Sequence, residues 1–289
     1  MKENKVLSLI LITIIYLLAS IVGICVYNCL SFHFAINLLI ADIVATTCVF
    51  IFSLIFKNSS VYDPYWSVQP IIIVTGFACV TKLEIHHILS LIAIILWGMR
   101  LTLNWAYTFK NLNWQDWRYV MLKEKTKWFY PFVNYLGIHM FPTLVVYLCI
   151  LPVVYLFKYD STLNIFTIIC FIVSICSIIL QGISDYQMHS FRKKNQGKLI
   201  REGLWKYSRH PNYLGEILMW WGMGLLAVLT LNSFYYLVLG ALVNTLMFIF
   251  VSIPMAEKHQ ASRKSGFEKY KEETNMLLPF KIGDKKYEK

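Results

Sequence analysis

The side chains best suited to chemistry lie in the run from Gly203 to Glu216, which reads GLWKYSRHPNYLGE. Pro211 favours a helix start, because its missing N–H has no partner to lose there. Asn212 and Glu216 are four residues apart and share one helical face, and Gly215 permits close packing beside them. The neighbouring side chains are cationic or aromatic: Tyr207, Arg209, His210 and Tyr213. A cationic rim above an amide and a carboxylate suits an anionic nucleotide. The alternative is a cationic membrane anchor followed by a polar helix contact.

A second polar stripe precedes this run. Asp185, His189 and Arg192 are spaced four and three residues apart, so a helix carries them on one face as it leaves the membrane. Lys193 and Lys194 follow directly. The stripe predicts a wall for phosphate and ribose groups, with Arg192 suited to bidentate phosphate contacts. The alternative is a juxtamembrane helix whose cationic side chains reach the lipid head groups.

Charged side chains also occur in or beside the apolar stretches. An ionised group at mid-bilayer costs at least ~2.5–3.5 kcal/mol and usually faces a cavity or a partner. Asp42 lies in the middle of one stretch, Asp63 precedes Pro64 at the start of another, and Arg100 lies within a third. Arg100 therefore either serves a functional site or pairs with one of these two aspartates.

The elements that position these groups are expected to be membrane helices. The chain has 289 residues, of which 57% are hydrophobic and 15% are charged, whereas soluble domains are about 45–50% apolar and about 25% charged. A helix needs about 20 mostly apolar residues to cross a bilayer. Eight stretches approach this length: 6–27, 33–56, 65–81, 87–108, 130–157, 162–184, 212–230 and 233–254. We therefore expect an all-α, polytopic transmembrane helical bundle with seven to eight spans.

Lys and Arg residues are distributed unevenly between the expected loops. With eight spans and a cytoplasmic N-terminus, 24 of the 27 fall in segments on the cytoplasmic side: 1–5, 57–64, 109–129, 185–211 and 255–289. The positive-inside rule therefore predicts that both termini and the 185–211 loop are cytoplasmic. Attraction to membrane lipids accounts for the net charge of +11, so no nucleic-acid partner is expected.

Several familiar ligand sites are absent from the sequence. It has no GxGxxG after a strand, no P-loop, no HExxH and no GxSxG. Its seven cysteines form no CxxC pair, so neither a metal site nor a disulfide is expected. A nucleotide must then be bound by helix ends and loops of the bundle. The tail from Met255 is expected to fold back as an amphipathic cap through apolar and aromatic side chains: Phe267, Tyr270, Leu277, Leu278 and Phe280.

The GLWKYSRHPNYLGE run resembles the C-terminal domain of the steroid 5-alpha-reductase family, especially its uncharacterised bacterial branch. Four other segments fit the same branch: YDPYWSVQP at 62–70, LWGMRLTLNW at 96–105, DWRY at 116–119 and F-x-x-Y…LLPF at 267–280. The resemblance separates N-terminal transmembrane helices over 1–60 from a reductase-like membrane domain over 61–289. The shorter Arg-His-Pro-x-Tyr core also occurs in isoprenylcysteine carboxyl methyltransferases.

This resemblance implies an NADPH-dependent reductase, in which a hydride goes to the β-carbon of an enone while an acid polarises the carbonyl oxygen. Asp63 falls at the position of the family's membrane carboxylate, and Gln181 falls at an asparagine of the cofactor site. The other cofactor-side residues implied by the motifs are Asp185, Arg192, Tyr207, Arg209, His210, Asn212, Tyr213, Glu216 and His259.

Two positions besides Gln181 depart from the family pattern. The catalytic tyrosine aligns near Trp97, which has no phenolic proton, and an arginine at the start of the tail falls near Met255. The missing acid is expected from Tyr62, Tyr65 or Tyr107. The catalytic candidates are accordingly Asp63, Tyr62, Tyr65 and Arg100.

The sequence thus predicts an NADPH-dependent reductase of an activated double bond in a steroid or other lipid-like substrate, and it indicates no protein partner. One alternative is an S-adenosylmethionine-dependent membrane methyltransferase, which the Arg-His-Pro-x-Tyr core and Glu257 favour. The other is a lipid-binding membrane protein without enzymatic activity.

Overall fold

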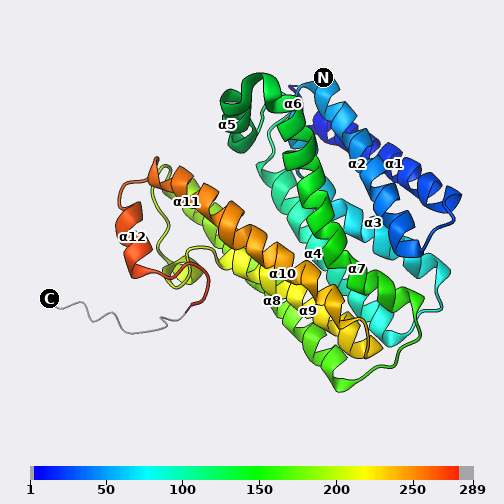
Figure 1. The fold of residues 1–289 in the computed structure, drawn as a ribbon. Helices are drawn as coiled ribbons and strands as arrows, with labels where there is room; N and C mark the ends of the chain where they lie inside the picture. Colours follow the sequence, from blue (N-terminus) through cyan, green and yellow to red (C-terminus); the bar gives the residue numbers. More distant parts are fainter. Residues whose placement is uncertain (1–2, 280–289) are drawn as a thin grey trace.

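The apolar stretches form long helices in the computed structural model, which describes residues 3–279 (Figure 1). Seven helical segments are long and apolar enough to cross a membrane: Lys5–Cys29 (α1), Phe34–Phe56 (α2), Ile85–Thr108 (α4), Trp117–Lys158 (α5 to α7), Ile165–Lys194 (α8), Pro211–Leu231 (α9) and Tyr235–Ala261 (α10 and α11). The eighth expected stretch forms α3 (Tyr65–Val80), whose 16 residues fall short of the usual length. No β-strand occurs within residues 3–279. The predicted all-α, multi-pass membrane bundle is confirmed.

Two of these segments are composite helices. The first joins α5 (Trp117–Thr126), α6 (Tyr130–Phe132), a π-helical stretch (Val133–Met140) and α7 (Phe141–Lys158). The second joins α10 (Leu239–Met247), a π-helical stretch (Phe248–Ser252) and α11 (Ile253–Ala261). The second extends past the apolar stretch 233–254, because helical hydrogen bonding continues to Ala261 where the side chains become polar enough to meet water. In the first, α5 is set apart from α6 and α7 by Lys127, whose φ of 45° ends α5.

The helix α8 is longer than predicted for the same reason. Its apolar part ends near residue 184, but the helix continues to Lys194. Asp185, His189 and Arg192 therefore lie on its last three turns, as their spacing predicts. The next membrane helix, α9, begins at Pro211, also as predicted.

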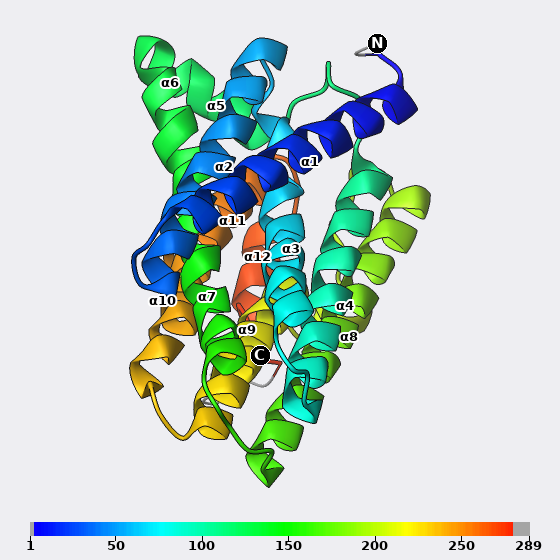
Figure 2. The same cartoon turned by 90° about the vertical axis from the view of Figure 1, so that its right-hand side faces the viewer.

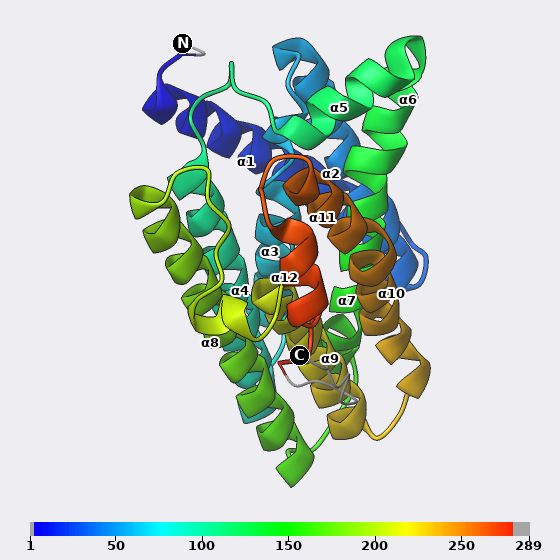
Figure 3. The same cartoon turned by 90° about the vertical axis from the view of Figure 1, so that its left-hand side faces the viewer.

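The helices pack into one bundle with an oblique first helix. Figure 2 shows α1 lying across α2 and α3, and α4 running beside α8. Figure 3 shows the opposite face, on which α11 and the tail helix α12 (Phe267–Glu273) lie nearest to the viewer. The N-terminus and the last turns of α4 and α8 lie toward the same end of the bundle.

Small residues bring α9 directly against α8. A Cβ atom on Gly215 would lie 2.5 Å from Gln181 Cγ, and one on Gly222 would lie 2.3 Å from Ser174 Oγ. Real side-chain carbons do not approach so closely, so glycine is required at both positions. This contact fixes the face that carries Asn212 and Glu216 beside the polar end of α8.

The tail folds back on the chain that leads into α9. A β-bridge pairs Ser208 with Asn275, and the Tyr270 hydroxyl group donates a hydrogen bond to the Trp205 carbonyl oxygen. Phe267 and Tyr270 are buried. The predicted cap is confirmed for these residues, whereas Phe280 lies outside the described residues.

Candidate functional site

A cavity of about 700 Å³ lies between the first half of the bundle, which runs through α7, and the second half, which begins with α8. The first half contributes Tyr62, Asp63, Arg100, Asn104 and Tyr119. The second half and the tail contribute Asp185, His189, Arg192, Arg209, His210, Asn212, Tyr213, Glu216 and His259. Most of the polar residues selected from the sequence therefore meet around one space, although they are up to 197 positions apart (62 to 259).

Arg100 is the centre of a polar network between α4, α8 and α9. Its Nη1 atom donates to Asp185 Oδ2 at 2.5 Å, and its Nη2 atom donates to Gln181 Oε1 and lies 3.9 Å from Glu216 Oε2. Arg100 thus forms an ion pair with an aspartate, which was one of the two alternatives for its position, but the partner is Asp185 and not Asp42 or Asp63. The reason is that α4 packs along α8, so the guanidinium group meets the carboxylate on the polar end of that helix.

Glu216 is held by two tryptophans as well as by this arginine. Trp97 Nε1 lies 3.0 and 2.9 Å from the two Glu216 carboxylate oxygens, and Trp220 Nε1 donates to Oε1 at 2.9 Å. Buried carboxylates are tolerated only when they are hydrogen-bonded and near a cation. Trp97 thus has a structural role that its sequence position did not reveal: its N–H group satisfies the carboxylate of α9.

Two residues of the polar stripe of α8 are hydrogen-bonded within the protein, and the third is not. Asp185 is bound by Arg100, and His189 Nε2 lies 2.6 Å from Asn104 Oδ1. Arg192, by contrast, makes no hydrogen bond or ion pair with any residue in the range 3–279. On α9, the Oδ1 atom of Asn212 is buried without a hydrogen-bond partner among those residues. These two groups remain available for a ligand.

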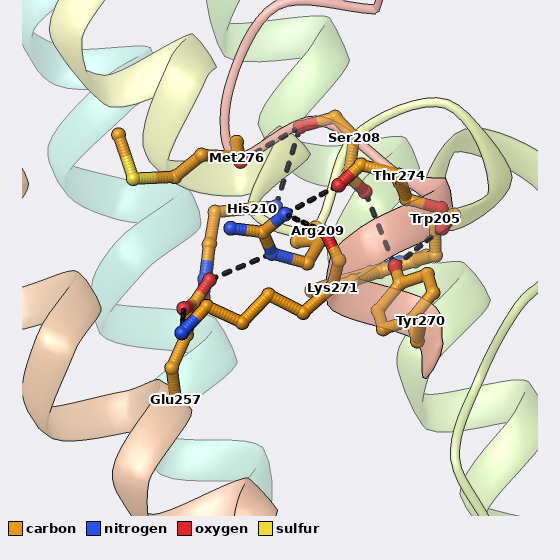
Figure 4. A network of polar contacts seen from close by, with 9 residues as sticks. All are labelled: Trp205, Ser208, Arg209, His210, Glu257, Tyr270, Lys271, Thr274 and Met276. Atoms are coloured by element: carbon orange, nitrogen blue, oxygen red, sulfur yellow. Dashed lines mark hydrogen bonds and ion pairs between the residues drawn. The ribbon is translucent and has the colours of Figure 1, made fainter. Parts of the chain in front are cut away.

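Arg209 and His210 hold the tail in place (Figure 4). Arg209 Nε donates to Glu257 Oε1 at 2.7 Å, and its Nη1 atom donates to the carbonyl oxygens of Lys271, at 3.0 Å, and Thr274. His210 Nε2 lies 3.1 Å from the same Glu257 oxygen. Both side chains line the cavity, but Arg209 Nε and Nη1 and His210 Nε2 are engaged by the protein. The Arg-His pair therefore shapes the cavity by joining the start of α9 to α11 and α12.

Four of the selected residues lie outside the cavity lining. Tyr207 is 56% exposed on the outer surface. Gln181 is fully buried behind Arg100. Tyr65 is buried against the Tyr16 and Tyr62 rings, at 5.3 and 5.8 Å between centroids. The third suggested acid, Tyr107, is also exposed and packs on His189.

Tyr62 and Asp63 line the cavity from the turn before α3. The Tyr62 hydroxyl group lies 2.8 Å from Thr143 Oγ1, and Asp63 Oδ1 accepts a hydrogen bond from the Tyr119 hydroxyl group. Burial raises the pKa of Asp63 from 3.8 to about 6, although Arg118 and the Tyr119 hydrogen bond oppose the rise. Tyr119 lies in the DWRY segment at 116–119, but nothing in the sequence singled out its hydroxyl group.

His259 and Trp117 close one side of the cavity. Their rings stack with centroids 3.6 Å apart and planes inclined by 13°. Trp117 begins α5 and His259 lies in the last turns of α11, so the contact joins the two halves of the bundle across the cavity. Sequence reasoning had selected His259 alone, because the stacking partner lies 142 positions earlier (259 minus 117).

Comparisons with known proteins place the chain among uncharacterised relatives. It is 22% identical to an uncharacterized protein of Schizosaccharomyces pombe, and the match covers 77% of this chain and 73% of that protein. No solved structure matches. The match to a family described as "Protein of unknown function (DUF1295)" spans residues 49–274, which includes all residues that line the cavity. The chain belongs to this family.

Proposed function

We propose that the protein is a membrane-embedded, NADPH-dependent reductase that saturates an enone-like double bond in a steroid or other lipid-like substrate. The observation that carries the proposal is the cavity of about 700 Å³, because it joins groups suited to an anionic nucleotide with an apolar wall and the carboxyl group of Asp63. The sequence resemblance to the steroid 5-alpha-reductases supports the same reading. We further propose that both termini and the 185–211 loop are cytoplasmic, where NADPH is available.

The nucleotide side of the cavity contains unengaged polar groups. Arg192 makes no hydrogen bond or ion pair with residues 3–279, and Lys198 and Lys264 line the same space, where Lys264 Nζ donates to the Lys198 carbonyl oxygen at 3.1 Å. Guanidinium and ammonium groups are the usual ligands of phosphate. The buried, unpartnered Oδ1 atom of Asn212 can accept a hydrogen bond from a carboxamide or hydroxyl group of the cofactor. These residues therefore fit a phosphorylated dinucleotide.

The other side of the cavity is suited to a lipid-like molecule. Its wall is formed by apolar side chains of the two composite helices: Ile138, Phe141, Val145, Val146, Met247, Phe248 and Val251. The 62–63 turn and α5 add the polar groups of Tyr62, Asp63, Arg118 and Tyr119 to this lining. A few polar groups in an otherwise apolar pocket orient a ligand by its carbonyl or hydroxyl oxygen.

The division of work between cofactor and protein follows from these groups. When bound, NADPH would supply a hydride to the β-carbon of the enone. The chain must hold the two molecules in contact, exclude water and provide a proton for the substrate oxygen. The apolar wall serves the first two tasks, and the Asp63 region serves the third.

Ligand-induced stabilisation of the purified protein tests the proposal. Thermal unfolding in detergent is measured with NADPH, NADP, NADH and S-adenosylmethionine, since a ligand at 100 times its Kd adds about 2.7 kcal/mol. We expect stabilisation by NADPH and NADP. A response to S-adenosylmethionine alone would instead identify a methyltransferase, and no response to any of the four would favour a non-enzymatic lipid-binding protein.

A further inference from the structure

Among the tyrosines that line the cavity, Tyr119 differs in the hydrogen-bond partner of its hydroxyl group. Four tyrosines line the cavity: Tyr62, Tyr119, Tyr213 and Tyr270. Tyr62 bonds to a threonine hydroxyl group, and Tyr270 donates to the carbonyl oxygen of Trp205. Within residues 3–279, Tyr119 is the one tyrosine with a hydrogen bond to a carboxyl group, that of Asp63. It is also 8% exposed, so it is shielded from bulk solvent while it faces the cavity.

The surrounding structure fixes this pair. Asp116 caps the start of α5, where its Oδ1 atom accepts bonds from the Arg118 backbone N–H at 2.9 Å and from Arg118 Nε at 2.7 Å. The Asp116 backbone N–H donates to Ser60 Oγ at 2.9 Å. The start of α5 is therefore joined directly to the turn that carries Asp63. Because both partners are held by their own elements, the phenol and the carboxyl group are preorganised.

We infer that Tyr119 is the proton donor of the proposed reaction and that Asp63 restores its proton. The inference rests on the proposed function and deepens it. It also accounts for the tryptophan at position 97, where the reductase family has a tyrosine. The Trp97 indole is occupied with Glu216, so α4 supplies no acid, and the required phenol comes from α5 instead.

The proton balance of the step is complete. Asp63 first takes up one proton from water. Tyr119 then gives its hydroxyl proton to the carbonyl oxygen as the β-carbon receives the hydride with its two electrons, and the Asp63 proton passes to the Tyr119 oxygen. The resulting enol loses the proton on oxygen and gains one at the α-carbon. The enone and NADPH thus consume one proton and yield the saturated ketone and NADP.

The decisive variants are Tyr119→Phe and Asp63→Asn, tested in the full chain with progesterone as the enone probe. A positioned acid contributes about 10²–10⁴-fold, so each variant should lower kcat by that factor, with little change in KM or in stabilisation by NADPH. Tyr135→Phe is the matched control, because it also removes a hydrogen-bonded phenolic hydroxyl group, which lies 2.9 Å from Thr47 Oγ1, but Tyr135 does not line the cavity. Asp160→Asn, in an exposed loop, serves the same purpose for the carboxylate.

A second measurement is independent of turnover. The carboxyl band of Asp63 is followed by infrared difference spectroscopy as a function of pH, in wild type and in Tyr119→Phe. Loss of the phenolic donor should shift the titration of this band to higher pH, because the carboxylate loses a hydrogen bond.

The outcomes separate the inference from the function on which it rests. If the wild type reduces progesterone and Tyr119→Phe retains that activity, Tyr119 is not the donor and the reductase proposal stands. If the wild type neither binds NADPH nor reduces the enone, the proposed function is wrong and the donor role fails with it. An Asp63 titration that does not respond to Tyr119→Phe would exclude the pair under either result.

Discussion

The indole N–H of Trp97 points between the two carboxylate oxygens of Glu216, at 3.0 and 2.9 Å. Both side chains are buried, so loss of the donor leaves part of the carboxylate unsatisfied. Trp97→Phe should therefore lower the free energy of unfolding by about 1–3 kcal/mol, measured by thermal unfolding in detergent. Trp128→Phe, at an 83% exposed position, should have no effect. A Trp97→Phe protein as stable as the wild type would show that Trp220 and Arg100 suffice for Glu216.

Removal of Arg100 should have a larger effect on stability. This guanidinium group is the partner of Asp185 and lies near Glu216, and breaking a buried ion pair costs about 3–5 kcal/mol. Arg100→Ala should lower the melting temperature strongly, whereas Arg100→Lys should restore part of the loss because it keeps the charge. Arg263→Ala in the exposed tail is the control. Equal stability of the Ala and Lys variants would contradict the importance of the charge.

Cofactor affinity should depend on Arg192 and Asn212. The loss of a hydrogen bond to a charged group is worth about 1.5–3 kcal/mol, which corresponds to tenfold or more. Arg192→Ala should accordingly weaken NADPH binding by at least about tenfold, and Asn212→Ala should weaken it measurably, without loss of stability in the free protein. Lys193→Ala changes the neighbouring cation, which does not line the cavity, and should bind as the wild type does. Unchanged affinity in both test variants would remove the nucleotide from this part of the cavity.

The protonation of Asp63 makes a prediction about pH. The charged and polar groups that face its carboxyl group are Tyr119, Arg118, Asp116 and Ser60, and burial still raises its pKa to about 6. Because the proposed step uses the protonated carboxyl group, kcat should fall as pH rises through this value. This fall should be absent from the pH profile of the residual activity of Asp63→Asn.

The same carboxyl group should affect stability in the same direction. Its pKa is higher in the folded chain than the ordinary value of 3.8, so its contribution is fully present below pH 3.8 and is lost as pH rises through 6. At 1.36 kcal/mol per unit, the change amounts to about 3 kcal/mol. Between pH 4 and pH 7, the wild type should therefore lose stability relative to Asp63→Asn. Thermal unfolding of both proteins across that range measures this change.

The orientation of the bundle can be tested by labelling from the outside. Asp160 precedes α8 and Lys194 is its last residue, so the two exposed positions lie at opposite ends of this helix. In a cysteine-free background, a membrane-impermeant maleimide should label Asp160→Cys in intact cells and Lys194→Cys only after permeabilisation. The reverse pattern would place the cavity mouth on the other side of the membrane.

The sequence predicted the membrane helices well because hydrophobic length determines them directly. Helix ends were predicted less well, since the charged turns of α8 and α11 remain helical beyond the apolar stretch. The α8 stripe and the start of α9 at Pro211 followed from spacing and from proline geometry. These features depend on neighbours in the chain.

Side-chain contacts between helices far apart in the chain could not be predicted from local sequence. Nothing local indicates that Arg100 meets Asp185, that Trp97 meets Glu216, or that Tyr119 meets Asp63. Each contact depends on which helices become neighbours and how they are rotated. The motif run likewise placed Arg209 beside a ligand, whereas its polar atoms bind the tail, because only the folded chain brings Glu257 within reach.

The bond between Arg209 and the tail has a consequence for biosynthesis. Phe267 and Tyr270 line the cavity, and Arg209 holds the Lys271 and Thr274 carbonyl groups. These residues emerge from the ribosome after the last membrane helix has been made. A nascent chain can thus insert α11 into the bilayer while its cavity still lacks one wall, so the cavity is complete only after the 267–274 segment has been made.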